Sequence, residues 1–208
     1  KVTRSQAVNQ AVKWIGSKES DGSHRKIIDV YNSRTPLPRG YKVKYIDDWC
    51  AIFASAIIVA IEATENMRFR ECSCPKMMQH FKDAGRWIES DSYVPEKGDY
   101  IFYDWDDTGK GDDVGSPDHV GIVEKVSDNM ITVIEGNKKD AVERRPLAVN
   151  GRYIRGYGLP YYAAEPKTSS NSKSTKTNTA AAGSKKTRTD SVNYIKTAQK
   201  AMNGFVGL

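Results

Sequence analysis

The chain has 208 residues, of which 38% are hydrophobic and 28% charged, and its formal net charge is +6. This length and apolar content suffice for one well-buried domain with appendages. Residues 1–163 carry 24 Lys and Arg against 24 Asp and Glu, whereas residues 164–208 carry 8 against 2, so the whole positive surplus lies at one end. Because a neutral body lacks the basic surface that nucleic acids require, we predict no nucleic-acid partner.

No segment of the sequence is long enough to span a membrane. The apolar run over residues 50–61 is far shorter than the ~20 residues that a spanning helix needs, and acidic residues flank it. The chain starts at Lys1 without a charged-then-apolar leader, which is also what a trimmed N-terminus would leave. We therefore predict no membrane partner.

The N-terminal third is predicted to be helical. Thr3 and Gln6 form a capping box ahead of apolar residues at helical spacing, and Gly16 ends this first helix. A second helix is predicted over residues 23–31. The prolines and glycine of residues 36–40 then force an irregular segment.

Cys50 opens an Ala-rich apolar run directly after Asp47 and Asp48. Either aspartate can serve as the N-cap of a helix that places Cys50 in its first turn. A thiol there lies near unpaired N–H groups and the positive end of the helix dipole, which favour the nucleophilic thiolate. One face of the helix is expected to consist of Ile52, Ala56, Val59 and Ala60.

Cys72 and Cys74 precede a helix predicted over residues 75–84. They are too close in sequence for an unstrained disulfide, and without a second pair they do not make a structural zinc site. We expect one of them to pack against the helix start, and both to be replaceable without loss of function. An odd number of cysteines argues against a disulfide-stapled secreted domain and fits folding in a reducing cytoplasm.

From residue 100 onward the pattern changes from helical to strand-like. Predicted strands are joined by Gly, Asp and Asn turns and cover residues 100–103, 119–127, 130–135, 141–149 and 152–157. Helices first and an antiparallel sheet later define an α+β domain, with the N-terminal helices packed on the sheet. This packing would put the helix of Cys50 against the strand that begins with His119.

His119 and either Glu135 or Asn137 complete a nucleophilic constellation with Cys50. The histidine would take the thiol proton, and the carboxylate or amide would fix the tautomer of the imidazole. Alternation along a strand puts residues 135 and 137 on one face, so both stay candidates, with Glu135 preferred because a carboxylate also stabilises an imidazolium. His24 and His80 lack such surroundings and are predicted to lie on the surface.

Four segments in this order resemble the CHAP domain (cysteine- and histidine-dependent amidohydrolase/peptidase), a papain-like group of peptidoglycan hydrolases. The resemblance covers roughly residues 3–162 and rests on Trp49-Cys50-Ala51-Ile52-Phe53, on residues 94–103, on Asp118-His119-Val120-Gly121-Ile122-Val123 and on Ile134-Glu135-Gly136-Asn137. It implies a papain-like fold, with Cys50 as nucleophile, His119 as base and Glu135 as third member. One departure is the lack of a glutamine in residues 41–49, which leaves the backbone N–H of Cys50 as the oxyanion donor that we can name.

Three aromatic residues are candidates for lining the substrate cleft. They are Trp49, Tyr103 and Trp105, and the alternative for each is ordinary core packing.

The acidic loop over residues 104–113 resembles the start of an EF-hand calcium loop. Oxygen ligands fall at its first, third, fifth and ninth positions, with Asp104, Asp106 and Asp112 as the carboxylates, and a glycine falls at the sixth. The match is incomplete because Gly115 stands where the twelfth-position glutamate is expected. A structural calcium ion is one hypothesis, and a solvated acidic hairpin loop is the alternative. The cysteine chemistry itself requires no cofactor.

The sequence divides into three parts. Residues 1–163 form the catalytic domain, residues 164–189 form a basic linker rich in Ser, Thr and Lys that we predict to be disordered, and residues 190–208 contain a short helix. That helix is similar to the first helix of a small peptidoglycan-binding repeat, and an isolated helix that docks elsewhere is the alternative.

The resemblance implies a peptidoglycan hydrolase, either an N-acetylmuramoyl-L-alanine amidase or an endopeptidase, of the endolysin or autolysin type. Such an enzyme acts on the bacterial cell wall, reached by phage-type release from a host cytoplasm or by export. We expect a monomer whose partner is peptidoglycan. The alternatives are a catalytically silent wall-binding module and a cysteine amidase for an amide outside the wall.

Overall fold

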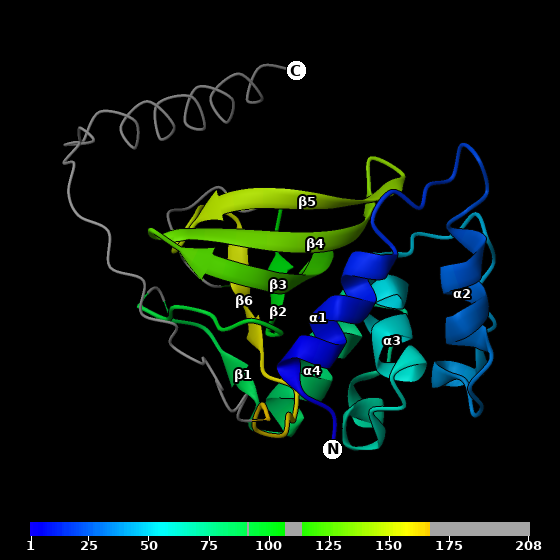
Figure 1. The fold of residues 1–208 in the computed structure, drawn as a ribbon, viewed down its shortest axis with the longest axis horizontal. Coiled ribbons are helices and arrows are strands. Elements are labelled where there is room, and N and C mark those ends of the chain that lie inside the picture. The colour runs from blue at the N-terminus through cyan, green and yellow to red at the C-terminus, as the bar shows by residue number, and fades with distance from the viewer. Residues whose placement is uncertain (91, 107–113, 167–208) are drawn as a thin grey trace, which may run out of the picture. The chain divides into compact units, whose positions relative to one another are not determined.

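The computed structural model describes residues 1–90, 92–106 and 114–166, which belong to one compact unit, Lys1–Lys167. The unit is an α+β domain in which helices pack on a six-stranded antiparallel sheet, as predicted (Figure 1). Within these ranges no helix combines the length and the apolar character needed to cross a membrane. Most of the predicted linker and the whole C-terminal helix, residues 167–208, lie outside the described residues.

Four α-helices and two short 3-10 helices precede most of the sheet. They are α1 (Arg4–Lys13), α2 (Arg25–Asn32), η1 (Pro38–Gly40), α3 (Cys50–Ala60), η2 (Thr64–Phe69) and α4 (Cys74–Asp83). The capping box at the start of α1 is confirmed, since the Gln6 N–H donates to the Thr3 side chain and the Thr3 N–H donates to the Gln6 side chain.

Helix α3 is the centre of the domain. It contacts α1, α2, η2 and α4 together with the strands β3 (His119–Ser127) and β4 (Met130–Lys138). Its first nine residues are all buried, so the predicted single apolar face is wrong: Val59 is half-buried and Ala60 is exposed. A helix that is apolar on every side can only be stable when neighbours cover it completely.

The six strands follow the order β1-β6-β2-β3-β4-β5 (Figure 1). The remaining strands are β1 (Trp87–Ile88), β2 (Tyr100–Tyr103), β5 (Ala141–Ala148) and β6 (Ile154–Gly158). The prediction missed β1, whose two residues are too few for a periodic pattern. Strand β4 continues to Lys138 instead of ending at 135, because a register irregularity between Glu135 and Lys138 lets the pairing with β5 resume.

Helix α3 and strand β4 meet at Gly136. A β-carbon placed on Gly136 would lie 2.3 Å from the β-carbon of Phe53, which is closer than packed carbon atoms approach. The ring of Phe53 therefore occupies the space that a side chain on this strand would take. Glycine at this position sets the spacing between the helix that carries Cys50 and the strand that carries Glu135.

His24 corrects one expectation about the surface. Its polar sequence neighbours suggested exposure, but the imidazole is buried, with Nε2 2.9 Å from the Tyr45 carbonyl oxygen and its ring 5.7 Å from that of Trp49. The irregular segment after α2 folds back over this histidine, which a local sequence pattern does not reveal. His80 lies closer to the surface than His24: it is half-buried, with 42% of its side chain exposed and its Nε2 3.7 Å from Glu71.

The two ends of the domain lie together. Thr3 and Ala163 form an isolated parallel bridge, and the Ser5 N–H donates to Glu165 at 2.7 Å. Asn66 exchanges two hydrogen bonds with the backbone of Tyr161. The contacts of the domain thus extend a few residues beyond the predicted boundary at 163.

We expect truncation after residue 166 to leave a folded domain, because the core clusters and the contacts between the ends lie within residues 1–166. The melting temperature should change by no more than ~2 °C, the shift that ~0.5 kcal/mol produces in a domain of this size. Thermal unfolding of the truncated and full-length chains, followed by circular dichroism, checks this. Loss of the cooperative transition would show that residues 167–208 contribute to the core.

Candidate functional site

Cys50 is the first residue of α3, so the helix itself leaves its backbone N–H unpaired. The predicted aspartate cap is wrong, because Trp49 occupies the N-cap position and makes no side-chain capping bond. Asp47 instead accepts hydrogen bonds from the Lys44 N–H and the Tyr41 hydroxyl, both at 2.8 Å. Asp48 accepts from the Asn137 amide at 3.3 Å.

The segment leading into β3 covers the start of α3. The Cys50 sulfur lies 3.9 Å from the Asp118 carbonyl oxygen, and Cys50 and His119 lie close enough for each to shift the pKa of the other. Both side chains are largely buried, with 7% of Cys50 exposed. The sheet therefore brings His119 to the thiol, as the order of elements predicted.

Glu135 holds the other side of the imidazole. Its Oε2 lies 3.3 Å from Nε2 of His119, which leaves Nδ1 of the ring for Cys50. The register pairs Glu135 with Gly121, where an added β-carbon would lie 2.8 Å from Cγ of Glu135. Because Gly121 has no side chain, the Glu135 carboxylate has room to reach His119, which lies two residues before Gly121 on β3.

Arg145 on β5 completes this arrangement. Its Nε donates to Oε1 of Glu135 at 2.7 Å, so each oxygen of the carboxylate has its own partner. Glu135 is 0% exposed, and a buried carboxylate is tolerated only when it is paired and hydrogen-bonded. Arg145 supplies a permanent positive charge for this purpose.

The charges of the site support one another. The hydrogen bond from Cys74 together with the hydrogen bond and charge of His119 holds the pKa of Cys50 well below its usual value, against the opposing effect of burial. Burial disfavours the imidazolium, but hydrogen bonds to Cys50 and Glu135 raise the pKa of His119 to about 9. Burial also opposes the charge of Glu135, whose pKa is nevertheless lowered by His119 and Arg145. These pKa shifts favour a thiolate and an imidazolium over a neutral thiol and imidazole.

Asn137 lies apart from the imidazole. It has a backbone φ of +57°, in the left-handed region, at the irregularity that follows Glu135. Regular alternation is broken there, and the amide turns to Asp48 beside the start of α3. Of the two predicted orienters, Glu135 is the one that contacts His119, and the function of Asn137 in the reaction stays a prediction.

The three predicted cleft aromatics have different positions. Trp49 is wholly buried and donates to Glu19 at 2.9 Å, and Tyr103 is also buried, so neither lines an open cleft. Trp105 is 39% exposed and stacks on Tyr103 with ring centres 4.8 Å apart. Its ring also lies 6.0 Å from that of His119. Trp105 is therefore the aromatic that a ligand can reach beside the histidine.

Cys72 and Cys74 lie in different surroundings. Cys74 is the first residue of α4 and is buried, which confirms that one cysteine packs at the helix start. Its sulfur lies 3.5 Å from that of Cys50, a contact that the sequence did not predict. Cys72 is half-buried and accepts a hydrogen bond from Arg39 at 3.0 Å.

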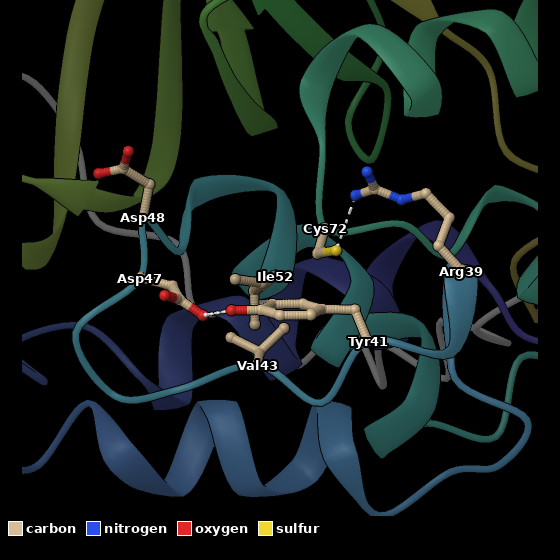
Figure 2. A pocket seen from close by; sticks show the side chains of 7 residues that line it. All are labelled: Arg39, Tyr41, Val43, Asp47, Asp48, Ile52 and Cys72. Carbon is tan, nitrogen blue, oxygen red and sulfur yellow. Dashed lines mark hydrogen bonds between the residues drawn. The ribbon is translucent and has the colours of Figure 1, made fainter.

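A cavity of about 490 Å³ flanks the start of α3 (Figure 2). Asp47 and Asp48 stand at one side of it and Arg39 at the other, while the ring of Tyr41 lies between them and points to Asp47. The rest of the lining consists of Val43, Ile52 and Cys72. The cavity thus has an acidic side and a basic side next to the nucleophile helix.

The acidic loop is described only in part. Asp104 is buried and its Oδ1 accepts from the Asp106 N–H at 3.1 Å, whereas Asp112 and the rest of 107–113 lie outside the described residues. Among the residues that the structure describes, no three His, Cys, Asp or Glu side chains gather as metal ligands do. Calcium binding at Asp104, Asp106 and Asp112 stays a prediction.

Comparison with known proteins agrees with this site. Residues 40–137 match the family model of the CHAP domain, a stretch that contains Cys50, His119, Glu135 and Asn137. The resemblance to the CHAP domain that the sequence indicated is thus confirmed. A crystal structure described as Ly7917 with the hydrolyzing product of MDP aligns at 17% identity with a TM-score of 0.47, and the alignment covers 76% of this chain and 63% of that one. The chain thus spans less than two thirds of that structure, and no curated protein matches it.

Sequence reasoning did not find Arg145, Asp48 and Cys74 as parts of the site. Arg145 belongs to a charged strand that reads as solvent-exposed, and its carboxylate partner lies on the neighbouring strand. The position of Asp48 just before an apolar run indicates a helix cap and gives no sign of its contact with Asn137. For Cys74, the available signal was a cysteine at the start of a second helix, which does not indicate that the two helix starts converge.

We predict that Glu135→Gln shifts the alkylation of Cys50 to higher pH, because the imidazolium that stabilises the thiolate loses its anionic partner. The midpoint should move up by about one unit or more, corresponding to ~1.4 kcal/mol of lost electrostatic stabilisation. Iodoacetamide labelling across a pH series, quantified on the peptide that contains Cys50, measures this shift.

Asn137→Ala is the matched control for this experiment. Its amide contacts Asp48, so the midpoint of Cys50 alkylation should stay close to that of the parent. An unchanged midpoint in Glu135→Gln together with a shift in Asn137→Ala would transfer the orienting function to Asn137.

Proposed function

We propose that this chain is a cysteine hydrolase that cleaves an amide bond of bacterial peptidoglycan. The observation that carries the proposal is the series Cys50, His119, Glu135 and Arg145, in which a cysteine at a helix N-terminus lies beside a histidine held by a buried, paired carboxylate. A CHAP domain supports a hydrolase that acts on peptidoglycan. An N-acetylmuramoyl-L-alanine amidase and a peptidoglycan endopeptidase share this chemistry.

In the first half of the reaction, the Cys50 thiolate attacks the carbonyl carbon of the scissile amide. The developing oxyanion is placed near the unpaired N–H of Cys50 at the start of α3. The carbon–nitrogen bond then breaks as the His119 imidazolium gives its proton to the leaving nitrogen. In this proposal His119 holds the proton before the substrate arrives and acts first as an acid, and it acts as the expected base in the second half of the reaction.

In the second half, water attacks the thioester carbonyl that the first half leaves on Cys50. The neutral imidazole takes a proton from this water, the carbon–sulfur bond breaks, and the thiolate and imidazolium are restored. Glu135 stays ionised throughout, holds Nε2 of the ring and stabilises its charge, while Arg145 keeps the carboxylate in place.

The surroundings of the nucleophile favour a charged peptide as the substrate. The cavity beside α3 presents carboxylates on one side and a guanidinium on the other, which is complementary to a peptide that carries both amino and carboxylate groups. Peptide stems of peptidoglycan have this character. Trp105 adds an exposed apolar ring on the side of His119.

We further propose action at the cell wall, as an endolysin or autolysin, with peptidoglycan as the partner. Mass spectrometry of the fragments released from defined peptidoglycan identifies the bond that is cut. New muramic acid lactyl carboxyl ends would show an amidase, and new ends within the stem or cross-bridge would show an endopeptidase. Binding without any released fragment would identify a silent wall-binding module, and cleavage of other amides alone would place the substrate outside the wall.

We expect Cys50→Ala and His119→Ala each to lower the rate of wall hydrolysis by at least ~10³-fold, because a nucleophile and its proton donor act as a unit. Turbidity clearance of purified walls measures the rate, and circular dichroism shows whether the variants fold. His80→Ala is the control histidine, since its half-buried side chain pairs with Glu71 and not with Cys50 or Glu135, and it should keep the parent rate. Clearance by either site variant at near the parent rate would disprove the mechanism.

The rate should also depend on pH through His119. Its pKa of about 9 means that the imidazolium persists across the neutral range and loses its proton as the pH rises through about 9. Above that point the leaving nitrogen lacks its proton donor, so kcat should fall roughly tenfold per pH unit. On the acid side, the lowered pKa values of Cys50 and Glu135 predict that activity persists below the pH at which an ordinary thiol gains its proton. A kcat that falls to half of its maximum as the pH rises through about 6.5, the pKa of an ordinary histidine, would contradict this assignment.

A further inference from the structure

Two cysteine thiols meet where two helices begin. Cys50 starts α3 and Cys74 starts α4, and their sulfur atoms lie 3.5 Å apart in a hydrogen-bonded contact. The two side chains are 7% and 5% exposed, so the pair lies at the floor of the site with little contact with bulk water. The hydrolytic reaction uses Cys50 and leaves Cys74 without a chemical step.

The pair is electrically asymmetric. The hydrogen bond to Cys50 and burial raise the pKa of Cys74 well above its usual value, while the hydrogen bond from Cys74 is the largest cause of the lowered pKa of Cys50. These opposite shifts favour a proton on Cys74 and a negative charge on Cys50. A thiolate next to a protonated thiol is the arrangement in which one sulfur is oxidised first and the second then displaces oxygen from it.

We propose that Cys50 and Cys74 form a peroxide-sensitive switch that turns the hydrolase off by joining the two sulfurs in a reversible disulfide. This inference adds regulation to the proposed function, and its effect on activity depends on Cys50 being the nucleophile. The formation of the disulfide depends only on the contact between the two thiols.

The chemistry balances with a hydroperoxide as the oxidant. The Cys50 thiolate attacks one oxygen of hydrogen peroxide, the oxygen–oxygen bond breaks, and Cys50 becomes a sulfenic acid while the released hydroxide takes up a proton to form water. The sulfur of Cys74 then attacks the sulfur of Cys50, and the hydroxyl group leaves with the proton of Cys74 as a second water. Two thiols lose two electrons in total, and one peroxide is reduced to two waters.

The sulfurs need only a small movement for this bond. A disulfide has a sulfur–sulfur length of ~2.05 Å, so the 3.5 Å contact must shorten by roughly 1.5 Å. Cys72 is the competing thiol, but its sulfur lies against Arg39 at the wall of the neighbouring cavity. The geometry therefore selects Cys74 as the partner of Cys50.

The switch also protects the nucleophile. A sulfenic acid that finds no thiol is oxidised further to a sulfinic acid, which thiol reagents do not reverse. A resolving thiol in direct contact captures the sulfenic acid first. Reduction by a dithiol then breaks the disulfide and restores the thiolate.

The test uses the reduced full-length chain, treated with hydrogen peroxide and then digested without reduction. Peptide mapping should show Cys50 linked to Cys74, and the intact mass should fall by two hydrogens. Wall hydrolysis should be lost in parallel and should return to within about twofold of the untreated rate after dithiothreitol. Linkage through Cys72, or no linkage while Cys50 is oxidised, would overturn the proposal.

Matched variants separate the two thiols, each compared with its own untreated rate. Cys74→Ser and Cys74→Ala should form no such linkage, should accumulate sulfinic acid on Cys50, and should stay at least ~10-fold inhibited after dithiothreitol. Cys72→Ser should behave as the parent does. Equal recovery in the parent and in both folded Cys74 variants would disprove the switch. If the reduced parent hydrolyses no wall but the mapped linkage forms, the proposed function fails and the thiol pair stands.

Discussion

The site depends on one buried negative charge. Glu135 is removed from water, and a carboxylate in that position is stable only because His119 binds one oxygen and Arg145 the other. From it, charges alternate in sign through the imidazolium to the thiolate of Cys50. The carboxylate on β4 thus joins β3, β5 and the start of α3, so that the stability of the sheet and the ionisation of the nucleophile have the same origin.

Much of this arrangement could be predicted from the order of residues along the chain. A cysteine at the start of an apolar run, a histidine at the start of a strand and a glutamate near the end of the next strand indicate a nucleophile, its proton partner and an orienter. The strands starting at residues 100, 119, 130 and 141 begin where the alternation indicated. The strand pattern alone does not separate Glu135, which was preferred for its charge, from Asn137, because the irregularity that turns Asn137 away depends on the pairing with β5.

Other features were beyond sequence reasoning because they depend on contacts between distant segments. Trp49 and His24 belong to polar stretches, yet both are buried, with their rings tilted against each other at 5.7 Å between centres. Arg145 reads as a surface residue until its partner on the adjacent strand is known. The convergence of Cys50 and Cys74 is set by how α3 and α4 pack, and the spacing of two cysteines in a sequence contains no such information.

Arg145 has contacts on both sides of its guanidinium. One side binds Glu135, and its other contacts are the rings of Trp105 and Tyr103, with centres 5.1 and 5.7 Å away. The same cation therefore belongs to the electrostatic support of the thiolate and to the underside of the exposed aromatic surface. A molecule that stacks on Trp105 would contact the same ring that Arg145 contacts. A ligand that moved Arg145 through Trp105 would also change the basicity of the imidazole, so binding at that surface and reactivity at Cys50 would be thermodynamically linked.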